Sequence, residues 1–215
     1  MSDLSYQFLS SFIAMSIPLF FVALMIGNKS SRSIILYFCW GLFAGILAFN
    51  INNYFGMGAG QSERLVLSVA PMVEEICKGL PLLLFLNKKR YPQITKLIIY
   101  CAMAIGIGFS IQESMYYFAI SSRELSDIVA LTIRTFTTAL MHGMTTAAIG
   151  MGLMFLHKYK QMLVPLIFGL FALSASIHAL YNLLLQTYLA VIVMVLPVFM
   201  FVLGWWIIRN QEDVE

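Results

Sequence analysis

The sequence predicts an all-α protein embedded in a membrane, a polytopic bundle of about seven transmembrane helices. Of its 215 residues 60% are hydrophobic and only 11% are charged, and the mean hydropathy is +0.87. A soluble domain is about 45–50% apolar and about 25% charged. The composition therefore excludes a soluble globular protein, and a net charge of only +3 excludes a nucleic-acid-binding protein. Three cysteines, an odd number and all within apolar runs, exclude a disulfide-stapled scaffold.

Seven apolar stretches reach or approach the length of about 20 residues that a helix needs to cross about 30 Å of hydrocarbon. They are Leu4–Ile26, Ile34–Asn52, Leu65–Leu86, Leu97–Ile120, Ile128–Phe155, Met162–Leu185 and Tyr188–Ile208. Short polar segments connect them, except that the last two spans meet at Gln186 and Thr187 almost without a linker. No internal repeat or separate extramembrane domain is visible. We therefore treat residues 1–215 as a single integral membrane domain.

Lysine and arginine are distributed unequally between the two sets of loops. One set holds nine of them: Lys29, Arg32, Lys88, Lys89, Arg90, Lys96, Lys158, Lys160 and Arg209. The opposite set holds only Arg64 and Arg123. Because cytoplasmic loops carry the excess of positive charge, we expect the N-terminus outside and the C-terminus in the cytoplasm.

Polar side chains remain inside the spans after the loops are set aside. Five are charged: Glu74, Glu75, Lys78, Glu113 and Arg134. His142, His178, Gln112 and Asn182 accompany them. At about 2.5–3.5 kcal/mol for each charge at a helix centre, five unpaired charges would cost roughly 12–18 kcal/mol. We therefore expect these groups, on four helices and in one layer between the midplane and the outer face, to face one another or a wet cavity.

The spacing of these residues predicts how they pair. Glu74 and Lys78 are four residues apart with the acid first, the favourable order on a helix, so we expect them to form an ion pair. Glu75 lies about 100° around the helix from Glu74, so one of the two carboxylates would pair with Lys78 or Arg134 while the other faces the cavity. Glu74 is the better placed of the two to pair with Lys78. His178 and Asn182 share one helix face, also at a spacing of four.

Each feature alone has a purely structural explanation. A single buried histidine can serve as an interhelical hydrogen-bonding group, Glu74 and Lys78 can form a structural pair, and Arg134 can extend to the outer surface. These explanations do not account for two histidines and three glutamates on four helices at one depth. Such a set either binds a divalent metal through imidazole and carboxylate groups, or lets a glutamate activate water while His and Asn polarise a carbonyl. Both chemistries hydrolyse an amide or an ester.

Four short motifs, in order on four consecutive predicted spans, resemble those of the PrsW family of intramembrane proteases. The run Ala70–Gly79 resembles its Glu-Glu-x-x-Lys motif, and Gly108–Tyr117 resembles its Gly-Phe lead-in to a Glu followed by Tyr. Met141–Gly143 fits the third motif, centred on His, and Ser176–Asn182 fits the fourth, His-x-x-x-Asn. The motif-bearing core is residues 65–185. The wider superfamily includes CAAX prenyl-proteases and bacteriocin-processing proteins, but Lys78 and Glu113 at their spacings favour the PrsW branch.

The resemblance implies an intramembrane endopeptidase of the bacterial cell membrane that cleaves a membrane-anchored protein, such as an anti-sigma factor, on its extracytoplasmic side in response to envelope stress. Its partners would be that substrate and the lipid bilayer, and no nucleic acid. The site residues expected to take part in catalysis are Glu74, Glu75, His142, His178 and Asn182, with Glu75 as the base that activates water and Asn182 as the oxyanion donor. The substrate-binding or orienting residues expected are Lys78, Glu113, Tyr117 and Arg134.

Two questions of mechanism and class stay open at this level. A bound metal, zinc by its ligands, would be held by Glu113, His142 and His178; without a metal the mechanism is a glutamate-activated water. The alternative function is an ion-coupled transporter in which the same groups relay protons or bind a cation. A non-catalytic scaffold of the same superfamily is the third alternative.

Overall fold

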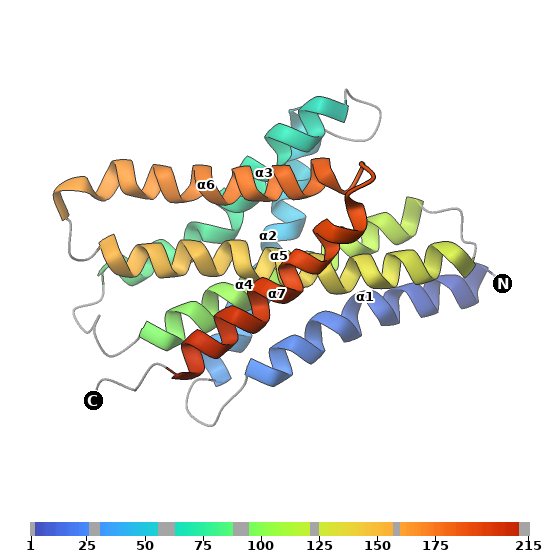
Figure 1. The fold of residues 1–215 in the computed structure, drawn as a ribbon, viewed down its shortest axis with the longest axis horizontal. Coiled ribbons are helices and arrows are strands. Elements are labelled where there is room, and N and C mark those ends of the chain that lie inside the picture. Colours follow the sequence, from blue (N-terminus) through green and yellow to red (C-terminus); the bar gives the residue numbers. More distant parts are fainter. Residues whose placement is uncertain are drawn as a thin grey trace.

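The structure is a computed structural model that describes residues 3–25, 31–55, 63–87, 95–120, 125–156 and 160–210. Within these residues the chain forms seven α-helices and no strand, which confirms the all-α prediction (Figure 1). The helices are α1 (Asp3–Met25), α2 (Ser31–Tyr54), α3 (Glu63–Gly79), α4 (Thr95–Ile120), α5 (Leu125–Leu156), α6 (Leu163–Leu184) and α7 (Ala190–Asn210). Two short 3₁₀ helices, η1 (Leu80–Asn87) and η3 (Lys160–Met162), follow α3 and precede α6.

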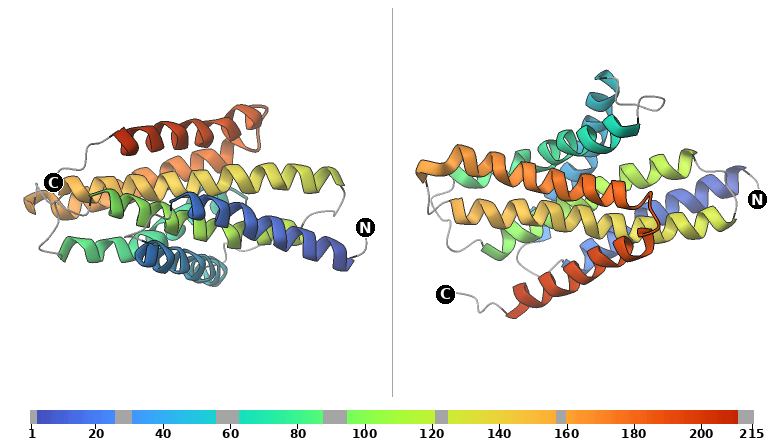
Figure 2. Two further views of the ribbon diagram at one scale, coloured as in Figure 1. Left: turned by 90° about the horizontal axis from the view of Figure 1, so that it is seen from below. Right: turned by 45° about the horizontal axis from the view of Figure 1, so that its top comes forward.

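Helix α4 lies at the centre of the bundle. It packs most extensively against α5 and α2, and α1 also runs along it (Figure 2). Residues 101–111 of α4 are buried without exception. Helix α3 packs against α6 and α2, while α7 covers α5. The four helices that carry the polar residues of the sequence, α3 to α6, are therefore neighbours.

Glycines allow the central helices to approach very closely. A Cβ atom added at Gly41 would lie 2.1 Å from the carbonyl oxygen of Ile105, and one added at Gly106 would lie 2.0 Å from that of His142. Real Cβ contacts are essentially never shorter than 3.0 Å. Small residues thus bring α2 and α5 against the backbone of α4, as in other membrane helix pairs.

Helix α3 differs from the continuous helix expected over Leu65–Leu86, because it ends at Gly79 and continues as the 3₁₀ helix η1. Pro81 explains the change, since it has no N–H to donate to the carbonyl of Cys77 four residues earlier. The indole N–H of Trp40 on α2 donates to that carbonyl instead, at 3.1 Å. The chain therefore leaves α-helical geometry directly after Gly79, next to a backbone carbonyl that is bonded to α2.

The predicted hairpin between the last two helices is present. Backbone N–H groups of Gln186 and Thr187 donate to carbonyls of the last turn of α6, at 3.2 and 3.0 Å. Helix α7 begins at Ala190, two residues after the expected start. The turn thus reverses the chain within five residues and lays α7 against α5.

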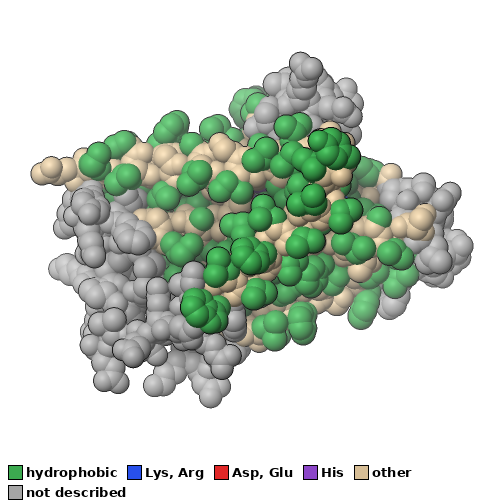
Figure 3. Space-filling view, viewed as in Figure 1, with side chains coloured by type: hydrophobic (Ala, Val, Ile, Leu, Met, Phe, Trp, Pro, Cys, Tyr) green, Lys and Arg blue, Asp and Glu red, His purple; other side chains and the backbone are tan. Residues whose placement is uncertain are grey.

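Three of the described helices are long and apolar enough to cross a membrane, over Arg32–Tyr54, Leu97–Ile120 and Leu163–Leu184. Hydrophobic side chains cover the face of the molecule shown in Figure 3, where α6 and α7 lie in front. Exposed examples on these two helices are Val164, Phe168, Val191 and Phe199, each at least 63% exposed. Such a surface suits contact with lipid rather than water. The count of seven spans and their orientation remain predictions.

Candidate functional site

The charged residues predicted inside the spans meet in one cluster between α3, α4, α5 and α6. Its members are Glu74, Glu75, Lys78, Glu113, Arg134, His142 and His178. Glu75, Lys78, His142 and His178 are fully buried, whereas the side chains of Glu74 and Glu113 are 19% and 15% exposed. The expectation that these groups face one another is confirmed.

Glu75 is the centre of the cluster and is surrounded by hydrogen-bond donors. Its Oε1 accepts from Lys78 Nζ at 2.5 Å and lies 2.9 Å from His178 Nδ1. Its Oε2 accepts from Ser174 Oγ at 2.8 Å, and Thr145 Oγ1 lies 3.5 Å from Oε1. The carboxylate is therefore both buried and fully engaged by the protein.

The expected pairing of Glu74 with Lys78 is wrong, since Lys78 binds Glu75, three residues before it. Both spacings place side chains side by side on a helix, so the choice depends on the neighbouring helices. On the Glu75 side, Ser174 and His178 of α6 supply two further donors to the carboxylate. A buried carboxylate with three partners is far better compensated than one with a single ion pair.

His142 connects Lys78 to a second ion pair. Its Nδ1 lies 2.9 Å from Lys78 Nζ, and its Nε2 lies 2.5 Å from Glu113 Oε2. Arg134 Nη2 donates to the other oxygen of Glu113 at 3.0 Å, and its guanidinium stands 3.7 Å from the ring centre of Tyr117. Arg134 is thus tied into the cluster rather than extended to the surface, and Tyr117 supports it.

Some buried polar atoms of this region have no hydrogen-bond partner among the described residues. They include Nε2 of His178 and Oδ1 of Asn182, which lie one turn apart on α6. Glu74 Oε2 lies 3.7 Å from His178 Nε2, a separation too long for a hydrogen bond. Because native structures rarely leave buried polar atoms unsatisfied, these atoms mark where water, a metal or a substrate group would bind.

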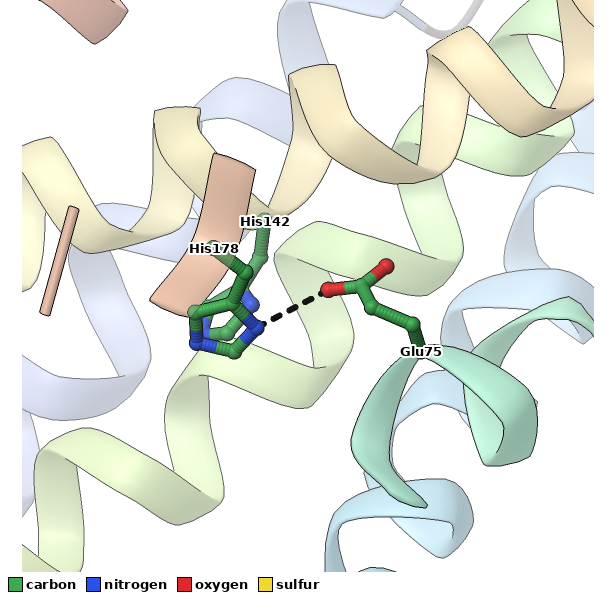
Figure 4. A group of neighbouring side chains, drawn as sticks. All are labelled: Glu75, His142 and His178. Atoms are coloured by element: carbon green, nitrogen blue, oxygen red, sulfur yellow. Dashed lines mark hydrogen bonds and ion pairs between the residues drawn. The ribbon is translucent and has the colours of Figure 1, made fainter. Parts of the chain in front are cut away.

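Three side chains lie close enough to offer ligands to one metal ion. One atom each of Glu75, His142 and His178 lies within 4.8 Å of the other two, and Figure 4 shows the carboxylate pointing at the two adjacent imidazoles. The predicted set contained Glu113 in place of Glu75. A carboxylate with two imidazoles is a donor set found in catalytic zinc sites. A metal ligand also needs an electron pair that no hydrogen-bond donor occupies, and Nε2 of His178 has no such donor among the described residues.

Two hydroxyl groups belong to the cluster although the sequence analysis did not place them there. Ser174 Oγ donates to Glu75, and it also lies 3.2 Å from the carbonyl oxygen of Thr145. The signal was present in the spacing, since Ser174 precedes His178 by four residues and Thr145 follows His142 by three. Serine and threonine are so common in membrane helices that this spacing alone does not single them out.

Comparisons with known proteins point to one family. Searches of curated proteins and of solved structures gave no match. A family model described as PrsW family intramembrane metalloprotease matches residues 29–207, which include all four helices of the cluster. The match extends over most of the 215 residues. The chain therefore belongs to the PrsW family of intramembrane metalloproteases, and it is an intramembrane protease.

Proposed function

We propose that the protein hydrolyses a peptide bond of a membrane-anchored protein at the cluster between α3 and α6. The observation that carries the proposal is that Nε2 of His178, fully buried beside the partly exposed carboxylate of Glu74, has no hydrogen-bond partner among the described residues. A lone pair and a carboxylate that the fold leaves free are the two groups needed to hold and deprotonate a water molecule.

Glu74 is the base in this proposal, and Glu75 is an orienting residue. The base expected from the spacing was Glu75, because Lys78 was expected to bind Glu74. Lys78 binds Glu75 instead, which leaves Glu74 free to act as the base. Glu75 accepts the Nδ1 proton of His178, which places the remaining lone pair of that ring on Nε2. A carboxylate plays this part for the catalytic histidine of serine proteases.

Asn182 is the proposed oxyanion donor. It follows His178 by four residues on α6, and its Oδ1 has no partner among the described residues. The carboxamide is thus free to turn its N–H group toward the carbonyl oxygen of a peptide held beside His178. One donor of this kind contributes about 10²–10³-fold to the rate in serine proteases.

The residues fit a metal ion at the free side of the cluster. His178 Nε2 and Glu74 Oε2, which lie 3.7 Å apart, would hold it, and Glu74 would then serve as a ligand rather than as the base. When bound, the metal supplies a Lewis acid that polarises the carbonyl and activates water. Zinc is the metal that imidazole and carboxylate ligands favour. Glu75 holds the His178 ring in the orientation that such a site needs, as carboxylates do beside zinc-bound histidines.

For the substrate we propose a single-pass membrane protein in the bacterial cell membrane, of the anti-sigma-factor type, cut on the extracytoplasmic side. Support comes from the resemblance of the four motifs and from the excess of Lys and Arg in the loops assigned to the cytoplasm. The superfamily shared with CAAX proteases is part of the same proposal.

The test is cleavage of a single-pass reporter protein by the purified protease in lipid nanodiscs. We expect Glu74→Gln to abolish cleavage with little change in thermal stability. His178→Ala should also abolish cleavage but lower stability by about 1–3 kcal/mol, because it removes a donor from the buried Glu75 carboxylate. His157→Ala should cleave as the unmodified protein does. Glu75→Gln also removes activity but lowers stability by about 3–5 kcal/mol, because it leaves Lys78 buried without its carboxylate. Full activity in both Glu74→Gln and His178→Ala would show that the cluster is not the site of hydrolysis.

A further inference from the structure

A cation of the chain itself already stands between Glu75 and His142. The Nζ atom of Lys78 lies 2.5 Å from Glu75 Oε1 and 2.9 Å from His142 Nδ1. It also lies 4.8 Å from the centre of the Phe109 ring, within range of a cation–π interaction. The lysine side chain is fully buried. Its ammonium group thus has two polar partners and one aromatic face, and no contact with solvent.

This contact determines which nitrogen of His142 carries the proton. An ammonium group has only donors, so Nδ1 of His142 must accept. The proton of the neutral ring is then on Nε2, which lies 2.5 Å from Glu113 Oε2 and donates to it. Both nitrogens of His142 are therefore engaged, and neither offers a lone pair to a metal.

His178 has the opposite arrangement. Its Nδ1 donates to Glu75 Oε1, and its Nε2 is buried without a partner among the described residues. The two rings are perpendicular, with centres 4.7 Å apart, so they are close in space but different in chemistry. By distance alone both histidines could be metal ligands. Their hydrogen bonds show that only His178 has a nitrogen without a partner among the described residues.

We propose that the ammonium group of Lys78 supplies the positive charge between Glu75 and His142. It occupies the position that a divalent ion would take between these two side chains. His142 is consequently a positioning residue that links Lys78 to Glu113, and His178 supplies the imidazole lone pair of the site. The inference rests on the proposed function only in taking this cluster as the site.

Distances support the exclusion of a metal from this position. Zinc lies about 2.0–2.2 Å from carboxylate oxygens and imidazole nitrogens. An ion bound at those distances from Glu75 Oε1 and His142 Nδ1 would overlap the ammonium nitrogen, which already lies within 2.9 Å of both atoms. The metal could enter only by expelling a buried lysine, which would then face an apolar interior without its counter-ion.

The first test measures the protonation and metal binding of each histidine nitrogen by NMR. The chain has only three, His142, His157 and His178, so ¹⁵N-histidine labelling in nanodiscs gives few signals, which single variants assign. We expect His142 to carry its proton on Nε2 and to keep both of its ¹⁵N shifts when one equivalent of Zn²⁺ is added. A zinc-dependent shift of His142 Nδ1 toward the value of a metal-bound nitrogen would overturn the proposal. This outcome does not depend on whether the protein cleaves anything.

The second test creates the site that Lys78 blocks. Lys78→Met keeps an unbranched side chain but removes the ammonium group, so it frees His142 Nδ1 and takes the cation away from Glu75 Oε1, which still accepts from His178. We expect this variant to bind one more zinc ion per chain than the unmodified protein, and Lys78→Met/His142→Ala to lose that additional ion. Lys160→Met is the matched control and should leave the zinc content unchanged. Equal zinc content in Lys78→Met and the unmodified protein would refute the inference, and if the variant does not fold, the histidine spectra of the unmodified protein decide.

Discussion

Gly106→Ala is expected to displace His142 while leaving every polar side chain of the cluster in the sequence unchanged. The added methyl group would lie 2.0 Å from the His142 carbonyl oxygen and 2.3 Å from its carbonyl carbon. An ordinary contact starts at 3.4 Å, so α4 and α5 must separate by about 1.4 Å at this point. Overpacking of this kind costs about 1–3 kcal/mol of stability. A displacement of about 1 Å in a catalytic arrangement costs about 10²-fold in rate.

The assay is cleavage of the reporter protein in nanodiscs, with thermal unfolding measured on the same samples. Gly169→Ala is the matched control, because a Cβ atom there has no neighbour within 4 Å. We expect the control to retain full activity and Gly106→Ala to lose about 10²-fold. If Gly106→Ala folds and cleaves at the normal rate, the close approach of α4 and α5 does not position His142, and the reasoning fails.

Three further predictions concern single contacts and the metal. Ser174→Ala removes a donor from the buried Glu75 carboxylate and should lower the stability measured by thermal unfolding by about 1–3 kcal/mol. Ser176→Ala is the control and should change stability little, because the exposed Ser176 hydroxyl donates to the carbonyl of Ala172 on its own helix. Trp40→Phe leaves the Cys77 carbonyl without its donor and should cost about 0.6–1.7 kcal/mol; an unchanged melting temperature would show that the bond is not needed at the break. Removal of zinc by 1,10-phenanthroline should stop cleavage, and added zinc should restore it. The melting temperature should fall little, because Lys78 binds Glu75 and His142 without a metal.

The helices were predictable because each corresponds to an apolar run of suitable length. The end of α3 at Gly79 was not predicted, although the sequence contains Pro81 two residues later. A proline inside a membrane helix can produce a kink, a 3₁₀ turn or almost no change, depending on what satisfies the freed carbonyl. Here the donor is Trp40, whose position opposite Cys77 follows only from the packing of α2 against α3.

The location of the site was predictable, but its internal pairing was not. The energetic cost of isolated charges in a membrane requires the charged residues to meet, whatever the details of the fold. Both glutamates lie within reach of Lys78 on its own helix, so the choice depends on what surrounds each carboxylate. Glu75 is surrounded by Ser174 and His178, on a helix about 100 residues away in the sequence. Spacing within one helix contains no such information.

Consecutive glutamates on a helix cannot share one environment, because they point about 100° apart. In this protein that geometry divides the site into a half that is complete and a half that is open. Glu75 lies in the complete half, with every oxygen engaged by Lys78, His178 and Ser174. Glu74 lies in the open half, beside a histidine nitrogen that has no partner among the described residues. The Glu75 carboxylate already has its hydrogen-bond partners, whereas the open half has unsatisfied atoms that can bind water or a substrate group. We therefore expect the chemistry in the open half, with Lys78 holding the Glu75 carboxylate in the complete half.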